Sequence, residues 1–355
     1  MNLIDYGYIP SLPAAPDMPQ EEAPGIPARI TAVHKERYEL VCEYGQAFGR
    51  LKTGIYYADS GESFPTTGDF VRIHFNKSGD SRIIKTLPRR SFFSRRDPTP
   101  GRGEQAVAAN FDYVFIMQSL NFDFSPKRLE RYVTLAWQSG AAPVLLLTKS
   151  DLAGDFTGQL RAAEKIAPGV DIYAVSAVSG AGLDALADYL KPRKTIVFLG
   201  SSGVGKSSLV NALAGKEIMA VNEIREDDSK GRHTTTHRQL IMLDSGVMII
   251  DTPGMRELGM WDVSQGLGEA FGDVEQYFGQ CKFKDCRHQT EPGCAVKAAI
   301  ENGELPPERW NSYLNLKREA KFSDDKGAYL RQKQQQHKAL AKRSKQQKKN
   351  GGYRQ

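Results

Sequence analysis

The chain has 355 residues, 40% hydrophobic and 25% charged, which is an ordinary composition for a water-exposed protein of two or three domains. No apolar run reaches the roughly 18 residues that a membrane-spanning helix needs, and the N-terminus lacks the basic start and apolar stretch of a secretion signal. These features argue against a membrane protein or a secreted one, so we expect a cytoplasmic protein that binds no membrane.

The first region of the chain is predicted to be a flexible arm followed by a small barrel. Residues 1–26 contain five prolines and little periodicity. Residues 27–90 then contain five short segments of alternating or β-branched residues, separated by turn residues. This pattern favours a five-stranded β-barrel, with the OB-fold as the leading candidate. Such barrels bind nucleic acid, although a protein-docking role fits the pattern equally.

A basic linker is predicted at residues 91–109, directly after the barrel. Two aromatic residues, Phe92 and Phe93, are interleaved with the basic residues of this region. The pattern suits phosphate contact with some base stacking, and a linker that covers apolar surface would look similar. The basic residues in and just before this segment are Arg89, Arg90, Arg95, Arg96 and Arg102.

Residues 110–259 alternate between apolar strands and helices. The strands are expected at 113–117, 144–147, 172–175, 195–199, 240–243 and 247–250. The helices are expected at 127–138, 159–166, 182–190 and 206–214. Unbroken apolar strands of this kind indicate an α/β domain with a parallel sheet that helices cover on both faces.

A phosphate-binding loop, GSSGVGKS, lies between the strand TIVFL and a predicted helix. Its three glycines let the backbone curl so that N–H groups point at phosphate oxygens. Lys206 can then reach the β- and γ-phosphates, the Ser207 hydroxyl can bind magnesium, and the helix presents its positive end to the anion. The predicted binding residues are Gly200, Ser201, Ser202, Gly203, Val204, Gly205, Lys206, Ser207 and Ser208.

Two further segments predict that the base of the nucleotide is guanine. The segment Thr148-Lys149-Ser150-Asp151 follows the strand PVLLL, and the Asp151 carboxylate can accept hydrogen bonds from the guanine N1–H and exocyclic amine. Adenine would leave this carboxylate unpaired, which costs roughly 1–3 kcal/mol or more. Ser176 and Ala177 follow the next strand, where GTPases place a backbone N–H against the guanine O6.

The sequence Asp251-Thr252-Pro253-Gly254 completes the nucleotide motifs. Asp251 ends an apolar strand and is predicted to hold magnesium through water, and the Gly254 N–H is predicted to contact the γ-phosphate. One of three consecutive threonines is expected to close over magnesium in the GTP state, with Thr235 as the candidate ligand. The other two threonines are Thr234 and Thr236.

Met255 occupies the position where many GTPases carry a glutamine that orients the attacking water. An apolar side chain cannot do this, so we predict slow hydrolysis by the protein alone. The missing polar group would then come from a partner or from His233 or His237, each of which is equally well explained as an ordinary loop histidine.

The order of these motifs is unusual, because the base-reading segment precedes the phosphate loop. Guanine-nucleotide switches usually place it last. The sequence therefore predicts a circularly permuted GTPase domain.

A metal site is predicted in a small helical domain at residues 260–325. Its cysteines and histidine follow the pattern C-x4-C-x-H-x5-C. Three thiolates and one imidazole make the closed tetrahedral set that holds one structural zinc ion, with free cytosolic cysteines as the alternative. The predicted ligands are Cys281, Cys286, His288 and Cys294.

The chain is predicted to end in a disordered basic tail at residues 326–355. Nine Lys or Arg and no acidic residue lie between 331 and 355, so the net charge of +6 comes from the tail. A polyanion-binding segment and a solubilising terminus fit this composition equally.

In their order, these motifs closely resemble those of the ribosome small-subunit-dependent GTPase A family, over roughly residues 27–320. The resemblance implies a permuted GTPase that acts late in the maturation of the small ribosomal subunit. Its hydrolysis of GTP to GDP and phosphate would be stimulated by that subunit, and its nucleotide state would control RNA binding and release. The barrel and the zinc domain would contact ribosomal RNA, magnesium would accompany GTP, and a monomer is expected.

Two alternatives belong to other classes of function. A GTPase that serves another RNA, a ribonucleoprotein or a membrane would call for an appended catalytic domain or an amphipathic anchor, and the sequence contains neither. A non-enzymatic RNA-binding module with a degenerate nucleotide site is the second alternative. Intact Lys206, Ser207 and Asp251 argue against it.

Overall fold

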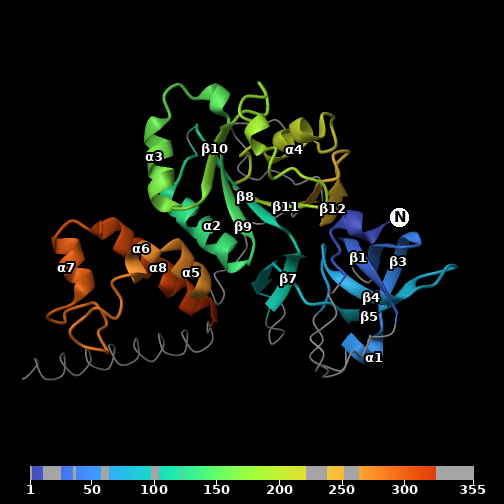
Figure 1. Ribbon diagram of the computed structural model, residues 1–355, viewed down its shortest axis with the longest axis horizontal. Coiled ribbons are helices and arrows are strands. Elements are labelled where there is room, and N and C mark those ends of the chain that lie inside the picture. Colours follow the sequence, from blue (N-terminus) through green and yellow to red (C-terminus); the bar gives the residue numbers. More distant parts are fainter. Residues whose placement is uncertain are drawn as a thin grey trace, which may run out of the picture. The chain divides into compact units, whose positions relative to one another are not determined.

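The computed structural model describes residues 2–10, 25–34, 37–56, 64–96, 104–121, 123–220, 238–251 and 264–324. The chain divides into two units, which we describe separately (Figure 1). Unit 1 comprises Met1–Leu258 and Gly268–Ala270, and unit 2 comprises Gly259–Leu267 and Phe271–Gln355.

Unit 1 begins with a closed five-stranded barrel, as the sequence predicts. The strands are connected in the order β1-β2-β3-β5-β4, and β4 pairs back to β1. All neighbours are antiparallel except β3 and β5, which are parallel. Side chains that point inward, such as Ile30, Leu40 and Ile83, are fully buried in the barrel core. The strands are β1 (Ile26–Val33), β2 (Tyr38–Cys42), β3 (Gly45–Leu51), β4 (Phe70–His74) and β5 (Ser81–Thr86), and the short helix α1 (Thr53–Tyr56) follows β3.

The second part of unit 1 is the α/β domain. Its strands β10, β9, β8, β11 and β13 are parallel to one another in that order, and β12 is antiparallel to β13. The central strands are almost wholly buried, which explains their unbroken apolar sequences. The strands are β8 (Tyr113–Ser119), β9 (Ala142–Thr148), β10 (Asp171–Val175), β11 (Thr195–Gly200), β12 (Gln239–Met242) and β13 (Met248–Asp251).

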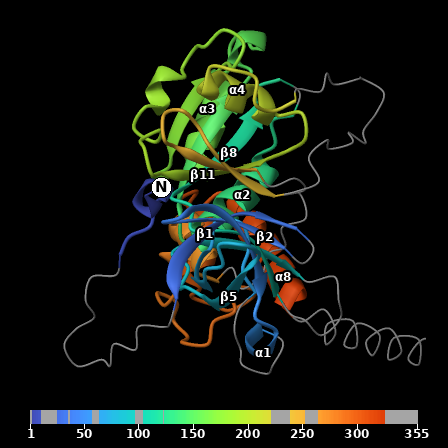
Figure 2. The same cartoon turned by 90° about the vertical axis from the view of Figure 1, so that its right-hand side faces the viewer.

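Helices cover this sheet (Figures 1 and 2). Helix α2 packs on β8 and β9 and also contacts α3. Helix α4 buries Leu209 and Val210 in the apolar core of the α/β domain. The helices are α2 (Pro126–Gln138), α3 (Thr157–Ile166) and α4 (Lys206–Ala214). The helix expected at 182–190 is replaced by turns and a 3-10 segment, η3 (Asp184–Leu186). Gly182, at the start of this segment, has a φ of +75°. A Cβ at this position would lie 2.2 Å from the Ala174 carbonyl oxygen, so the turn requires glycine.

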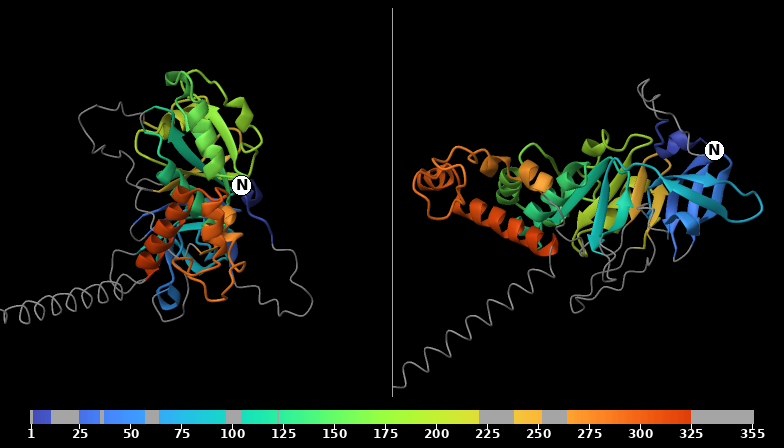
Figure 3. Two further views of the ribbon diagram at one scale, coloured as in Figure 1. Left: turned by 90° about the vertical axis from the view of Figure 1, so that its left-hand side faces the viewer. Right: turned by 90° about the horizontal axis from the view of Figure 1, so that it is seen from below.

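The barrel and the α/β domain share one continuous sheet. Strand β1 of the barrel pairs with β12 at Ala32 and Gln239. Eleven strands are therefore hydrogen-bonded side by side in one sheet (Figure 3). The segment predicted to be a linker forms a hairpin of β6 (Phe92–Arg96) and β7 (Glu104–Ala109). Phe93 is buried in this hairpin and stacks on Phe111 at 4.9 Å, which explains why the segment is folded.

Arg29 is the largest fully buried side chain of the described residues and lies where the barrel meets the α/β domain. Its guanidinium donates to the carbonyls of Gly68 (3.2 Å) and Asn110 (2.9 Å), and to the Thr195 hydroxyl (3.1 Å) at the start of β11. Burial lowers the pKa of Arg29 to about 9, so the group stays charged at neutral pH. One buried cation thus ties together segments from across unit 1.

The first residues of the chain take part in the same junction. Residues 2–10 lie in the region predicted to be a flexible arm, yet Leu3–Tyr6 form a 3-10 turn, η1, capped by Asn2, with Leu3 buried. The Tyr6 carbonyl accepts a hydrogen bond from Arg29. The turn is ordered because it supplies both an apolar side chain and an acceptor to the junction.

Within the described residues, unit 2 contains three whole helices and the first part of a fourth, α5, whose last residues, Gly268–Ala270, belong to unit 1. Phe271, Val274, Val296 and Leu305 are buried in its small core, where Arg309 lies over the Phe271 ring at 4.0 Å. These helices agree with the small helical domain that the sequence predicts in this region. The four are α5 (Ser264–Ala270), α6 (Gly272–Glu275), α7 (Ala295–Glu301) and α8 (Pro307–Asp324).

Candidate functional site

Three motifs that are distant in the sequence meet around one cavity in unit 1. The cavity has a volume of about 140 Å³ and lies where β9, β10 and β11 end. Because parallel strands end at the same edge of a sheet, their following loops converge there. The lining residues are Thr148, Lys149, Asp151, Leu152, Val175, Ala177, Val178, Val204, Gly205, Ser208 and Leu209.

Thr148 links the base-reading segment to the phosphate loop. Its side chain is buried, and its hydroxyl donates a 2.7 Å hydrogen bond to the Val204 carbonyl. Lys149 follows in the left-handed region (φ +59°), and the chain then turns into the 3-10 segment η2 (Ser150–Leu152). The strained residue directs the chain so that Asp151 lines the cavity and is exposed to a ligand.

The loop after β10 is held by the Ser176 side chain. Its buried hydroxyl accepts hydrogen bonds from the N–H groups of Val178 (3.2 Å) and Ser179 (3.1 Å). Its backbone N–H donates to the Ala181 carbonyl at 2.9 Å. The serine thus fixes the turn from inside, and Ala177 lines the cavity beside Asp151.

The phosphate loop has the curled backbone that its glycines predict. Gly203 and Gly205 have positive φ angles of 76° and 101°, and α4 begins at the next residue, Lys206. A Cβ on Gly200 would lie 3.1 Å from the Met117 carbonyl oxygen, so the strand end is tightly packed. Because α4 begins directly after the loop, the N–H groups of its first turn and its positive dipole end point toward the loop.

Two side chains of the phosphate loop are paired with carboxylates. The Lys206 ammonium donates to Asp251, which is buried with 3% of its side chain exposed at the end of β13. The Ser201 hydroxyl donates to Asp123. The lysine and the aspartate predicted to act on phosphate and magnesium are thus adjacent, although they are 45 residues apart in the chain.

Asp123 is a site residue that the sequence analysis missed. It lies after the carboxyl end of β8, forms a 2.9 Å ion pair with Arg128 of α2, and contacts the phosphate loop through Ser201. Nearby, Gln118 is buried with one amide nitrogen lacking a hydrogen-bond partner among the described residues. The position of β8 beside β11 was the available signal, because polar residues after the carboxyl ends of adjacent parallel strands meet at one edge.

Several predicted site residues lie outside the described residues. They belong to the segments at 221–237 and 252–263. Their roles stay predictions. They are His233, His237, the three threonines Thr234, Thr235 and Thr236, and Gly254.

The predicted metal ligands of unit 2 come together in one cluster. The ligand atoms of Cys281, Cys286, His288 and Cys294 all lie within 4.8 Å of one another. The His288 Nδ1 is 3.5 Å from the Cys281 sulfur and 3.4 Å from the Cys294 sulfur, and these two sulfurs are 4.0 Å apart. Zn–S bonds of about 2.3 Å in a tetrahedron place sulfurs roughly 3.8 Å apart, so the spacing fits a zinc ion.

The loop that carries this cluster is held in a specific conformation. His288 has a positive φ of 59° and its ring stacks on Phe278 at 4.8 Å. The Glu291 carboxylate accepts hydrogen bonds from three backbone N–H groups of the loop. Hydrogen bonds from backbone N–H groups, of which its own N–H has the largest effect, lower the pKa of Glu291 to about 2. Within the described part of the chain, this is the one group of three or more Cys, His, Asp or Glu residues placed to hold a metal ion.

No helix among the described residues is long and apolar enough to cross a membrane.

Comparisons with known proteins agree on one family. The model of the RsgA GTPase family matches residues 86–261. A curated relative from Listeria monocytogenes serotype 4b, "Small ribosomal subunit biogenesis GTPase RsgA 2", is 46% identical over 88% of this chain and 90% of its own length. A relative from Methanosarcina acetivorans, "Small ribosomal subunit biogenesis GTPase RsgA", is 42% identical over 82% of this chain and 79% of its own length.

Two solved structures are also similar to this chain. The crystal structure of YjeQ from Thermotoga maritima has a TM-score of 0.61 at 26% identity, and the match covers 82% of this chain and 96% of that one. The crystal structure of YloQ, described as a circularly permuted GTPase, has a TM-score of 0.59 at 26% identity and covers 85% and 97%. The permuted order read from the motifs agrees with these structures.

Proposed function

Because this chain belongs to the RsgA family of GTPases, we propose that it is a GTPase that acts in the biogenesis of the small ribosomal subunit. It hydrolyses GTP slowly alone and faster on the subunit, and its nucleotide state controls binding to and release from ribosomal RNA. The observation that carries the proposal is the cavity shared by Thr148–Asp151, Ala177 and the phosphate loop.

Asp151 selects guanine in this proposal. Its exposed carboxylate lines the cavity and accepts the two N–H groups on one edge of guanine. Thr148 holds the two loops in register through its hydrogen bond to Val204, so the base and the phosphates are bound by one connected structure. This geometry supports discrimination against adenine by roughly 1–3 kcal/mol or more.

The phosphate loop binds the triphosphate through backbone N–H groups and Lys206. Its present partner, Asp251, is released from Lys206 when phosphates provide a stronger anionic partner, and the carboxylate then faces the metal position with the Ser207 hydroxyl. These oxygen ligands suit magnesium, with Thr235 as the proposed third protein ligand. Magnesium supplies neutralisation of phosphate charge when it is bound with GTP.

The proposal also assigns the group that orients the attacking water. Met255 cannot orient water, so His233 or His237 supplies the polar group, or the subunit does, and Gly254 senses the γ-phosphate. Substitution of each histidine by alanine tests this assignment. Unchanged turnover on the subunit for both His233→Ala and His237→Ala would assign the group to the partner.

The cluster of unit 2 binds one structural zinc ion in this proposal, and the chain works as a cytoplasmic monomer that binds no membrane. The thiolates of Cys281, Cys286 and Cys294 and the ring of His288 fit the ion by distance. A closed four-ligand set leaves no open position for chemistry, so the ion stabilises the fold. The barrel and unit 2 supply the RNA-binding surfaces.

The decisive experiment measures GTP turnover with and without purified small ribosomal subunits. We expect stimulation by the subunit and co-sedimentation with it in the presence of a non-hydrolysable GTP analogue. Asp151→Asn is the control, because an amide at this position repels the guanine N–H groups and accepts xanthine instead. An absence of both stimulation and co-sedimentation for the wild-type protein would refute the function.

A further inference from the structure

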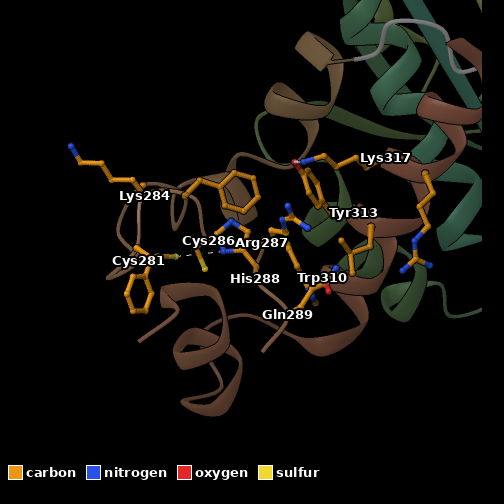
Figure 4. Close-up of a pocket in the computed structure, with 14 residues that line it drawn as sticks. Cys281, Lys284, Cys286, Arg287, His288, Gln289, Trp310, Tyr313 and Lys317 are labelled. Carbon is orange, nitrogen blue, oxygen red and sulfur yellow. Dashed lines mark hydrogen bonds between the residues drawn. The ribbon is translucent and has the colours of Figure 1, made fainter. Parts of the chain in front are cut away.

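A groove borders the metal-binding loop of unit 2 and is too large for a metal ion alone. It has a volume of about 720 Å³ and lies between the loop at 278–289 and the α8 face at 310–318 (Figure 4). Volumes of this size are typical of sites that bind an organic ligand. From its walls and charges we propose that the groove binds one unpaired nucleobase of an RNA strand with its adjoining phosphates. The inference rests on the proposed action on a ribosomal particle and specifies how one surface would engage RNA.

Aromatic rings form the walls of the groove. The Phe278 ring stacks on His288, and Trp310 lies edge-on to Phe278 with ring centroids 6.4 Å apart. Trp310 and Tyr313 are themselves stacked at 5.7 Å and 16°. Flat rings of this kind are the surfaces on which proteins stack unpaired bases, whatever the base sequence.

The groove is also positively charged. Its lining includes Lys284, Arg287, Lys317 and Arg318 and no acidic residue. The Lys317 ammonium lies 5.3 Å from the Tyr313 ring centroid, so a cation is already placed beside the aromatic wall. Two carboxylates lie beside lining residues, since Glu275 accepts a hydrogen bond from the Tyr313 hydroxyl and Glu291 accepts one from the Gln289 N–H, and the four cations outnumber them.

The combination favours RNA over an acidic protein segment. Both partners would use the lysines and arginines, but the Asp and Glu side chains of an acidic segment offer no aromatic ring to stack on Trp310. Gln289 adds an amide at the groove that can donate to and accept from a base edge. The phosphates on either side of the base then lie within reach of the cations on both walls.

The test uses the full-length, zinc-loaded protein and a fluorescein-labelled single-stranded oligouridine, with a poly-glutamate peptide as the competing probe. We expect Trp310→Leu to weaken oligouridine binding by about 5- to 150-fold, the effect of losing one base stack, whereas Trp310→Phe retains most of the affinity. Lys317→Gln should weaken it also. Lys282→Gln is the matched control, because Lys282 is exposed on the same loop but does not line the groove.

Zinc content and helix content, measured for each variant, show whether unit 2 stays folded. If Trp310→Leu unfolds unit 2, the Trp310→Phe variant and photo-crosslinking of a 5-iodouridine oligonucleotide to Trp310 decide instead. Equal RNA affinity of Trp310→Leu, Trp310→Phe and the wild type, or tighter binding of poly-glutamate than of oligouridine, would overturn the proposal.

This outcome is separable from the proposed function. Subunit-stimulated turnover with no Trp310 dependence of RNA binding would reject the groove alone. Trp310-dependent RNA binding without any stimulation would reject the proposed function and leave the groove.

Discussion

The two units of the chain position their functional groups in different ways. In unit 1, buried parallel strands end at one edge, and backbone hydrogen bonds across eleven strands fix where the loops of the nucleotide site lie. In unit 2, the short helices bury a small core, and the loop at 281–294 is arranged around four ligand side chains. Sheet registry should therefore preserve the nucleotide site without its ligand, whereas the unit 2 loop should depend on its metal.

Metal removal separates the two units with the largest expected effect. Structural zinc contributes on the order of 10–16 kcal/mol of binding free energy in small domains, which exceeds what so small a core supplies. Cys281→Ser, or treatment with a strong chelator, should unfold unit 2 and make it sensitive to protease. GDP affinity should not change, because none of the residues that line the nucleotide cavity belongs to unit 2.

Cys42→Ser is the control for this experiment, because Cys42 is buried in the barrel and is remote in sequence from the cluster. Zinc content by elemental analysis and protease mapping report on unit 2, and GDP titration reports on unit 1. Loss of GDP binding after chelation would contradict the independence of the two sites.

Disruption of the Arg29 junction is expected to have the next largest effect, and only on unit 1. Arg29→Met leaves the buried Asn110 carbonyl without its donor and removes one of the two donors to the Gly68 carbonyl. A buried acceptor that loses its donor costs roughly 1–3 kcal/mol. Urea unfolding followed by circular dichroism should show unit 1 destabilised as a whole, with zinc retained in unit 2.

Arg82→Met provides the matched control, since Arg82 is exposed on β5 of the same barrel. It should change stability little. A variant in which the barrel unfolds alone, while the α/β domain keeps its transition, would show that the shared sheet does not make unit 1 cooperative.

The sequence predicts local elements of unit 1 better than its long-range connections. Apolar strands, glycines and the motif residues are each recognisable within a short window, so the barrel strands, most helices and the two nucleotide loops follow from pattern alone. The pairing of β1 with β12 does not, because two short strands give no signal of which edge they join. Arg29 reads as an ordinary polar strand residue, and its partners lie 23 to 219 residues away.

In the candidate sites too, local motifs can be predicted from the sequence, whereas long-range contacts cannot. The Cys/His spacing predicts the metal cluster because its ligands fall within 14 residues of sequence. Asp123 was missed because its contact with Ser201 bridges 78 residues and belongs to no motif. The aromatic groove also depends on tertiary packing, since Phe278 and Trp310 come from separate elements.

Within the nucleotide site, Thr148 tests how strongly the sheet fixes the base-reading loop. Thr148→Ala leaves the Val204 carbonyl without its donor, at a cost of roughly 1–3 kcal/mol, so GDP affinity should fall about 5- to 150-fold. Thr148→Ser keeps the hydroxyl and should bind nearly as the wild type does. Isothermal titration with GDP makes the measurement, and equal affinity of all three proteins would mean that backbone registry alone positions the loop.

At Ser201 the phosphate loop of unit 1 is held by a side-chain contact rather than by the sheet, as the loop at 281–294 of unit 2 is arranged around side chains. Its hydroxyl donates to Asp123, which is itself paired with Arg128. Ser201→Ala should lower the stability of the nucleotide-free protein by about 1 kcal/mol, the net value of one hydrogen bond. GDP should restore most of this loss, because the phosphates bind backbone N–H groups that the substitution leaves intact.

Ser202→Ala is the control for Ser201, because Ser202 is the exposed neighbour on the same loop. Thermal unfolding with and without GDP provides the readout. A loss of the same size in both conditions would show that the contact with Asp123 persists in the bound state, and that the carboxylate belongs to the nucleotide complex. A loss confined to the free protein would show that side chains hold the phosphate loop only until its ligand binds.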